Sequence, residues 1–420
     1  MGMFSRAASL AAVPVKTGAR FASAATATAF GADKDTAYGN ALSSSIESLT
    51  SALAKARGPA LKFGQILALF SSTLPPEQAA QLASLGRLYE NAEPRPWAKV
   101  EPLVVGLPPG THIDPDAIAA ASLGQVHTGT WPDGRRIAIK IQYPDAPRIV
   151  RADMLQLRTF IPLIHRLFPT LDVKSLLDEH AERLWEELDY TREARWQTMF
   201  RDAWASARPG VVTIPRVLHA SPTLLVTEWL PGIPYASLTD APVEQRDAAG
   251  RLLARFTLWS AHLVGAVHAD PHPGNYRLLD DGSLGVLDFG SVGHPAGAFT
   301  DLFVRTFDFA AAGDLEGLRQ MWLDAGMLVE TTTADELVEL LAIDLTPYYE
   351  DEFRFSSEWM TGRANGWADP AASMQNVGKL TFPPGLLLEH RAVTGMLALM
   401  TSIDATVDFR AVLDGALDPR

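Results

Sequence analysis

The fold is decided by His268-Ala-Asp270-Pro-His272-Pro-Gly-Asn275, which is followed by Leu287-Asp288-Phe289-Gly290. Asn275 stands five positions after Asp270, and Asp288 stands directly before Phe289-Gly290. Asn and Asp side chains carry the oxygen atoms that Mg²⁺, a hard ion, prefers as ligands. The spacing therefore predicts a metal site formed by Asn275 and Asp288, with the carboxylate of Asp270 beside it.

These residue types suit phosphoryl transfer, which needs a carboxylate near the nucleophile, metal ligands at the phosphates and a cation on the developing charge. The spacing matches the catalytic loop and the Asp-Phe-Gly element of protein kinases, with Asp270 as the catalytic carboxylate. The turn Asp280-Asp281-Gly282 predicts a hairpin between the two elements. Loop acids also cap turns, and either motif alone fits that reading. Both motifs at this gap favour a kinase-like site.

A lysine and a glutamate upstream complete the predicted phosphate clamp. Ala119–His127 and Arg136–Gln142 are predicted as two strands, with Pro132-Asp133-Gly134 as the turn. Lys140 ends the run Ile137-Ala-Ile-Lys140, and a kinase lysine at this place binds phosphates while a helical glutamate orients it. Glu193 is the candidate for that glutamate. The alternative for Lys140 is an edge-strand lysine that prevents aggregation.

Two further segments are predicted to hold the nucleotide. An alanine-rich run occupies the place of the glycine-rich loop, and its stiffer backbone should sit differently over the phosphates. Its candidate cofactor-binding residues are Ala119, Ala121, Ser122, Gly124 and Val126. The segment Thr227-Glu228-Trp229-Leu230 is predicted to be the hinge, where backbone groups of Glu228 and Leu230 would bind adenine.

Composition excludes several classes of protein. The 420 residues contain 36 Lys and Arg against 49 Asp and Glu, a net charge of −13, which argues against nucleic acid as a partner. The absence of cysteine excludes disulfides, thiolate nucleophiles and Cys-ligated zinc. No apolar stretch reaches the roughly 20 residues of a membrane span. The protein is therefore expected to be cytoplasmic or to lie at a membrane surface.

The pattern of elements predicts an α+β, protein-kinase-like bilobal fold with an N-terminal helical extension. Residues 1–35 form a basic leader without acids before Asp33, which fits a loose terminus, a membrane-surface helix or an organellar transit peptide. Residues 36–110 form the helical extension, and 111–230 an N-lobe with inserted helices. Residues 231–420 form a helical C-lobe with the catalytic loop and the Asp-Phe-Gly element, and the chain from Phe299 onward is predicted to be helical.

Taken together, these residues resemble the UbiB/AarF family of atypical kinase-like proteins over about residues 45–300. The family's markers are an alanine-rich loop, a K-x-G-Q element and an E-x-D element. This chain carries them as Ala119 to Gln125, Lys62-Phe63-Gly64-Gln65 and Glu187-Leu188-Asp189. The resemblance implies ATP and Mg²⁺ bound between two lobes. It also implies that the K-x-G-Q helices cover the docking face of a protein substrate, with Lys62 and Gln65 pointing into the site near Glu187 and Asp189.

The resemblance links the chain to isoprenoid-quinone biosynthesis and to lipid-related ATPase activity. Two features depart from these patterns. Bacterial members of the family often carry C-terminal membrane spans, and none is recognised in this sequence. His272 stands where ordinary protein kinases place a lysine. The first hypothesis is an ATP- and Mg²⁺-dependent kinase or ATPase that acts on, or is stimulated by, a lipid or quinone-precursor-like molecule. The alternatives are a nucleotide-gated lipid-binding module or chaperone with negligible turnover, and a conventional protein kinase. The leader is the predicted contact with anionic membranes.

Overall fold

The structure is a computed structural model of the whole chain. It describes twelve segments, and every structural statement below concerns them: 19–20, 22–23, 26–28, 33–55, 59–68, 93–120, 123–167, 172–295, 299–366, 379–381, 383 and 386–417. Most of the predicted leader, including its basic residues Arg6 and Lys16, lies outside the described residues.

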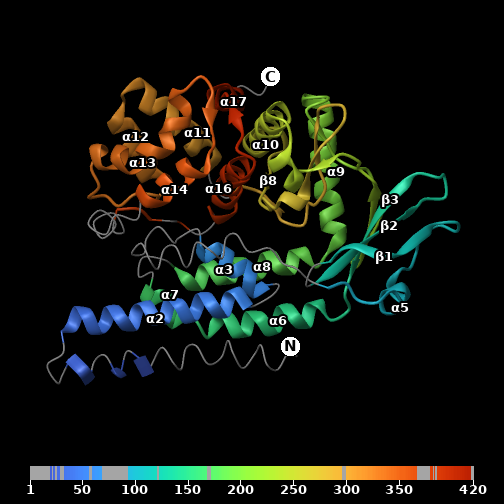
Figure 1. Ribbon diagram of the computed structural model, residues 1–420, viewed down its shortest axis with the longest axis horizontal. Coiled ribbons are helices and arrows are strands. Elements are labelled where there is room, and N and C mark those ends of the chain that lie inside the picture. Colours follow the sequence, from blue (N-terminus) through green and yellow to red (C-terminus); the bar gives the residue numbers. More distant parts are fainter. Residues whose placement is uncertain are drawn as a thin grey trace.

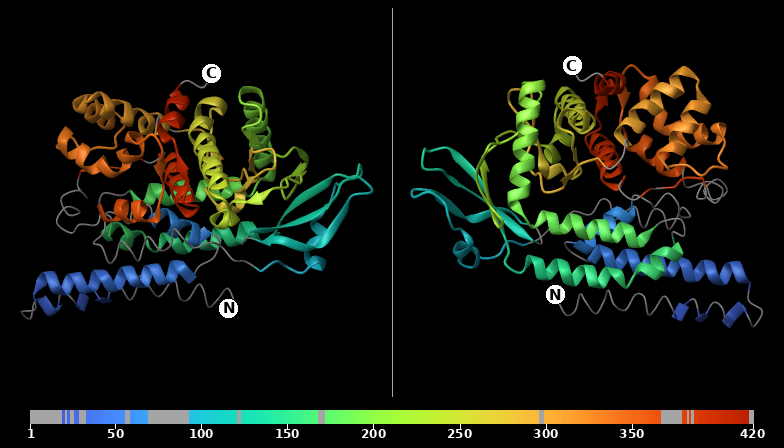
Figure 2. Two further views of the ribbon diagram at one scale, coloured as in Figure 1. Left: turned by 45° about the horizontal axis from the view of Figure 1, so that its top comes forward. Right: turned by 180° about the vertical axis from the view of Figure 1, so that it is seen from behind.

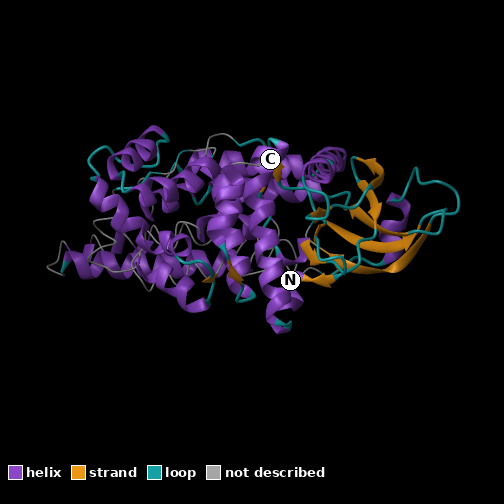
Figure 3. Cartoon of the chain, turned by 90° about the horizontal axis from the view of Figure 1, so that it is seen from above, coloured by secondary structure: helices purple, strands orange, loops and turns teal. Residues whose placement is uncertain are grey.

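A five-stranded antiparallel sheet forms the N-lobe (Figures 1 and 3). Its strands, in spatial order, are β1 (His112–Ala120), β2 (Gly124–Thr130), β3 (Arg136–Gln142), β6 (Leu224–Glu228) and β5 (Val217–Ser221). Ile137, Ile139 and Ile141 alternate along β3 and are fully buried in the apolar core of this lobe. Because successive strand residues point to opposite faces, Lys140 projects from the other face of the sheet.

The predicted single strand Ala119–His127 was wrong, because it spans two strands. β1 ends at Ala120 and β2 begins at Gly124, and the two pair antiparallel. The predicted turn between β2 and β3 is present at residues 132–134, where Gly134 has a φ of 89°. At Gly124 a Cβ atom would lie 2.6 Å from the carbonyl oxygen of Ile141 and 2.9 Å from the hydroxyl of Tyr190, so this position requires glycine.

Short strands position the two catalytic motifs. A four-stranded sheet has the order β4 (Val212–Thr213), β10 (Leu284–Val286), β9 (Tyr276–Leu278) and β7 (Ile233–Pro234). The predicted hairpin at residues 280–282 joins β9 to β10, with Gly282 at a φ of 82°. β8 (Val267–His268) pairs with β11 (Val292–Gly293), which places the residues after the Asp-Phe-Gly element beside the catalytic loop.

Helices build the rest of the C-lobe around a large apolar core (Figure 1). They are α10 (Val243–Val264), α11 (Phe299–Ala312), α12 (Leu315–Asp324), α13 (Ala334–Tyr349), α14 (Ser357–Gly366), α16 (Leu387–Ser402) and α17 (Phe409–Leu417), with 3-10 turns η4 (Tyr235–Asp240) and η5 (Pro273–Asn275). Within the described residues from Phe299 onward the chain is mainly helical, as expected. The exceptions are a short ribbon formed by β12 (Phe353–Arg354) and β13 (Thr406–Val407) and an isolated bridge between Leu328 and Leu380. No helix among the described residues has the length and apolar character needed to cross a bilayer.

A separate layer of helices lies against the C-lobe, on the side that carries the K-x-G-Q element (Figures 1 and 2). It consists of α2 (Lys34–Lys55), α3 (Pro59–Ala68), α6 (Ala146–Arg158), α7 (Ile161–Leu167) and α8 (Val173–Glu187). The inserted helices α6 and α8 pack against α3. Two helices lie with the sheet instead, namely α5 (Trp97–Val100) with the turn η3 (Glu101–Leu103), and α9 (Tyr190–Ala207).

Candidate active site

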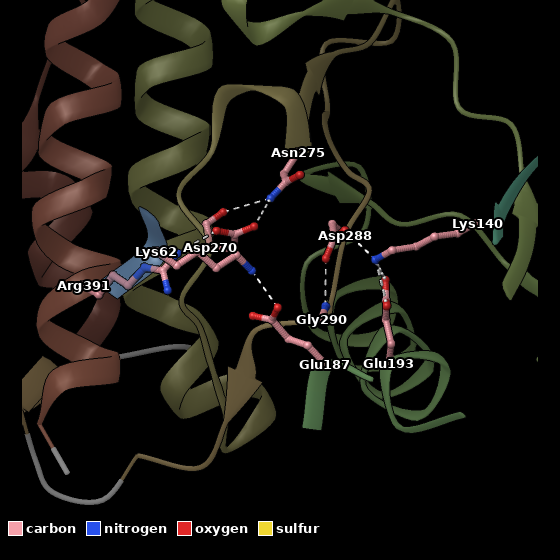
Figure 4. A network of polar contacts seen from close by, with 9 residues as sticks. All are labelled: Lys62, Lys140, Glu187, Glu193, Asp270, Asn275, Asp288, Gly290 and Arg391. Atoms are coloured by element: carbon pink, nitrogen blue, oxygen red, sulfur yellow. Dashed lines mark hydrogen bonds and ion pairs between the residues drawn. The ribbon is translucent and has the colours of Figure 1, made fainter. Parts of the chain in front are cut away.

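Lys140, Glu193 and Asp288 form one ion-paired cluster between the lobes (Figure 4). The ammonium of Lys140 donates to both carboxylate oxygens of Glu193 at 2.9 Å and to Oδ2 of Asp288 at 2.8 Å. Burial alone would lower the pKa of Lys140, but the charges of Asp288 and Glu193 raise it well above its usual value. Lys140 is therefore charged at neutral pH, and it joins β3, α9 and the Asp-Phe-Gly element.

The start of α9 positions Glu193 in this cluster. Asp189 is the N-cap, and its Oδ1 accepts the backbone N–H of Thr191 at 3.0 Å and the hydroxyl of Thr191 at 2.6 Å. A cap of this kind satisfies a free helix N–H and defines where the helix begins. Glu193, one turn later, is 4% exposed and faces Lys140.

The catalytic loop brings Asp270 and Asn275 together. The amide nitrogen of Asn275 donates to Oδ2 of Asp270 at 2.8 Å and to its backbone carbonyl at 3.1 Å. The buried His268 contacts the backbone oxygen of Asp288 through Nε2 at 2.6 Å, and burial lowers its pKa. The loop and the Asp-Phe-Gly element are therefore linked directly, as their spacing in the sequence indicated.

The donor atoms fit Mg²⁺. Each oxygen of Asp288 accepts one hydrogen bond, Oδ1 from the backbone of Gly290 and Oδ2 from Lys140, which leaves each a further lone pair. Since the nitrogen of Asn275 is directed at Asp270, its amide oxygen points away from that carboxylate (Figure 4). The described residues contain no cluster of three His, Asp or Glu side chains placed to hold a metal. A magnesium ion would therefore be held by Asn275, Asp288 and nucleotide phosphate oxygens, an arrangement usual for this ion.

The K-x-G-Q lysine reaches the site from the helical layer. Nζ of Lys62 on α3 lies 2.6 Å from Oε2 of Glu187 at the end of α8, and the two side chains are 29% and 14% exposed. Burial acts to lower the pKa of Lys62, but the charges of Glu187 and then Asp270 raise it. The resemblance grouped Asp189 with Glu187 near Lys62. In the described part of the chain, however, Asp189 caps α9 and Lys62 pairs with Glu187. The side chain of Gln65 lies outside the described residues.

Arg391 is a residue of this site that the sequence did not indicate. Its Nη2 lies 2.9 Å from Oδ1 of Asp270, so both oxygens of this carboxylate are engaged. Burial would raise the pKa of Asp270, but Arg391 and Lys62 hold it well below its usual range. Arg391 reaches Asp270 because α16 packs closely on the catalytic loop. One turn along the helix, a Cβ atom on Gly395 would lie 2.0 Å from the ring of Pro271.

The sheet limits which backbone group of Glu228 is available for the predicted contact with adenine. The backbone N–H of Glu228 donates to the carbonyl of Arg216 at 3.0 Å, and that of Trp229 to the carbonyl of Arg136 at 3.0 Å. These donors belong to the sheet, so a backbone contact between Glu228 and adenine would use its carbonyl oxygen. The carboxylate of Glu228 is paired with Arg135.

The remaining predicted residues lie near the clamp or outside the described chain. Ala119 ends β1, while Gly124 and Val126 lie on β2, where Val126 pairs with Lys140 of β3. Ala121 and Ser122 lie outside the described residues. His272 accepts the backbone N–H of Gly274 through Nδ1 at 3.0 Å, and partial burial lowers its pKa. A neutral imidazole therefore replaces the cation that protein kinases place here.

Comparison with known proteins identifies the family of the chain. The model of the ABC1 atypical kinase-like domain matches residues 111–322, about half of the chain. The Synechocystis protein slr0889 is 32% identical over 253 residues, which are 56% of this chain and 61% of that protein. The mitochondrial atypical kinase coq-8 of Caenorhabditis elegans is 26% identical over 379 residues, which are 86% of this chain and 49% of that protein. The chain thus spans about half to three fifths of the length of these relatives.

A solved structure shows the same architecture over most of the chain. It is the complex of Rv3197 with erythromycin from Mycobacterium tuberculosis, which is 29% identical, with a TM-score of 0.66. The similarity covers 90% of this chain and 97% of that one. Family model, relatives and fold agree with the motifs of the catalytic loop, and the chain belongs to the ABC1 atypical kinase-like family, the UbiB/AarF group.

Proposed function

We propose that the chain binds Mg·ATP between its lobes and transfers or hydrolyses the γ-phosphate, with a lipid or small-molecule partner as acceptor or activator. The observation that carries the proposal is the cluster of Lys140, Glu193 and Asp288 beside the pair of Asp270 and Asn275. These five side chains come from four separate parts of the sequence, and they supply the cation, metal ligands and carboxylate that phosphoryl transfer needs.

Each residue has a defined part in this proposal. Lys140, oriented by Glu193, would hold the α- and β-phosphates, and Asn275 with Asp288 would hold Mg²⁺, which neutralises charge on the phosphates. Asp270 would orient the attacking hydroxyl or water through its carboxylate. For that, one of its oxygens must exchange its contact with Arg391 or Asn275 for the nucleophile, because both are engaged in the structure.

Because α3 lies over the catalytic loop, a small or lipid-like partner should reach the site more easily than a peptide. α3 places Lys62 near Asp270 and secures it by Glu187. A small surface pocket opens at this place, with both charged and apolar lining: Lys62, Glu179, His180, Arg183, Leu184, Glu187, Ser291, Leu388 and Arg391. The Mycobacterium tuberculosis relative was solved with erythromycin, a small organic molecule. Kinship with coq-8 supports a role in quinone or lipid metabolism, in an organelle or at a membrane.

Steady-state hydrolysis of Mg·ATP separates this proposal from its alternatives. We expect a measurable basal rate that rises when lipid or quinone-precursor analogues are added, and no phosphorylation of generic protein substrates. Efficient phosphorylation of unrelated proteins would favour a conventional protein kinase. Mg·ATP binding without turnover, with or without lipids, would favour the nucleotide-gated binding module.

The leader carries the predicted membrane contact. Residues 1–30 contain Arg6, Lys16 and Arg20 and no acids, whereas the whole chain has a net charge of −13. Basic segments bind anionic lipid with about 1 kcal/mol per charge, and salt weakens the attraction. Full-length protein should therefore sediment weakly with anionic vesicles at low salt, and a variant starting at Ala32 should not. Equal sedimentation of both proteins would assign membrane binding to another part of the chain.

A further inference from the structure

An arginine cluster lies on the C-lobe, where the end of α9 meets α10. Arg251, Arg255 and Trp259 are spaced by four residues, so they follow one stripe of α10. Arg208, the C-cap of α9, faces the same stripe. The guanidinium carbons of Arg208 and Arg255 each lie 5.3 Å from the centroid of the Trp259 ring. Two cations therefore lie against one indole, and Arg251, one turn before Arg255, adds a third positive charge beside them.

The indole is a fixed platform. Trp259 is 7% exposed, its Nε1 donates to the carbonyl of Val412 at 2.8 Å, and its ring stacks on that of Trp204 at 6.5 Å. α10 packs between α9 and α17 at this place (Figure 1). The two guanidinium groups consequently have a rigid surface to lie on, which reduces the entropy lost when they bind a ligand.

The cluster has no counter-charge among the residues that the structure describes. No carboxylate there is ion-paired with Arg208, Arg251 or Arg255, and the Nε atoms of Arg208 and Arg255 are buried without a hydrogen-bond acceptor. The nearest acid on the stripe, Asp247, accepts the backbone N–H of Thr406 at 2.7 Å. Burial and then the charges of Arg251 and Arg208 lower the pKa of Arg255. Like charges held together in this way destabilise the protein unless an anion binds.

We propose that Arg208, Arg251 and Arg255 form a binding site for a phosphate group, on a different surface from the catalytic cleft. Guanidinium groups present planar pairs of N–H donors that match phosphate oxygens, and three of them can engage one tetrahedral group. Arg251 is exposed and Arg208 and Arg255 are half-buried, so the ligand enters from solvent. The phosphate group belongs either to a soluble phosphorylated molecule or to a lipid headgroup.

The test compares the full-length parent with Arg255→Gln, with Arg208→Gln as a second variant and Arg148→Gln as a matched control. Arg148 is exposed on α6, remote in the sequence from the cluster. Melting temperatures are measured in phosphate-free buffer and across a series of inorganic phosphate concentrations. Phosphate bound in the catalytic cleft should shift the melting temperature of all four proteins equally. The difference in this shift between parent and variant therefore measures phosphate binding to the arginine cluster.

In phosphate-free buffer, Arg255→Gln should melt at or above the temperature of the parent, because a repelling charge is removed. Phosphate should stabilise the parent and the Arg148→Gln control, and its affinity should fall about tenfold in Arg255→Gln and Arg208→Gln. Vesicles containing phosphatidic acid identify the source: flotation of the parent but not of Arg255→Gln indicates a lipid headgroup, and no flotation indicates a soluble phosphate. Equal phosphate affinity in all four proteins overturns the proposal.

Discussion

Asp270→Asn should lower the rate of ATP turnover by about 10²- to 10³-fold, the contribution of a positioned general base. Mg·ATP affinity should change little, because the proposed metal ligands are Asn275 and Asp288. Asparagine has nearly the same shape as aspartate. Its side-chain oxygen can therefore still accept a hydrogen bond from Arg391 or from Asn275. Single-turnover hydrolysis and equilibrium nucleotide binding, measured on the same preparation, separate the two effects.

The matched control is Asp280→Asn in the exposed turn between β9 and β10. It makes the same chemical change close by in the sequence without touching the catalytic loop, and it should leave turnover within about twofold of the parent, as expected for a surface substitution. Turnover by Asp270→Asn at the rate of this control would remove Asp270 from the catalytic role.

Lys62→Ala should raise autophosphorylation by about five- to tenfold. This factor corresponds to roughly 1 kcal/mol, the free energy expected of a partly exposed ion pair such as Lys62 with Glu187. The ammonium of Lys62 is secured by Glu187 at 2.6 Å and lies close enough to Asp270 to perturb its pKa. Removing it opens a path to the catalytic carboxylate for segments of the chain itself. Phosphate incorporation, ATP turnover and melting temperature are measured together.

Two further variants make this result specific. Glu187→Gln should have an effect similar to that of Lys62→Ala, and the double variant should add little, because both changes break one interaction. Lys174→Ala, an exposed lysine on α8, should change neither activity nor stability by more than about 0.5 kcal/mol. If Lys62→Ala behaves like Lys174→Ala, the lysine does not cover the site.

Local motifs made the catalytic loop and the Asp-Phe-Gly element predictable, because their function depends on residues close in the sequence. The fixed spacing of Asp270, Asn275 and Asp288 was enough to predict one site that combines these three side chains. Lys140 and Glu193 are 53 residues apart, and their contact was predicted only because the kinase pattern supplies the pairing.

Contacts that depend on tertiary packing could not be predicted. Arg391 is 121 residues from Asp270. Their contact depends on the close packing of α16 on Pro271, which is possible because Gly395 has no side chain. Which backbone group of Glu228 is left for adenine could not be predicted without the strand register, because the sheet uses its N–H. The uncompensated charge around Trp259 likewise arises from two helices that meet only in the folded chain.

The melting temperature with and without Mg·ATP tests the central claim most directly. At a nucleotide concentration about a hundred times the Kd, binding should stabilise the fold by about 2.7 kcal/mol, or roughly 3 °C for a chain of this length. The shift should need Mg²⁺, should be largely lost in Asp288→Asn and should persist in Asp270→Asn. If saturating Mg·ATP and Mg·ADP both leave the melting curve of the parent unchanged, the cluster of Lys140, Glu193 and Asp288 does not form a nucleotide site.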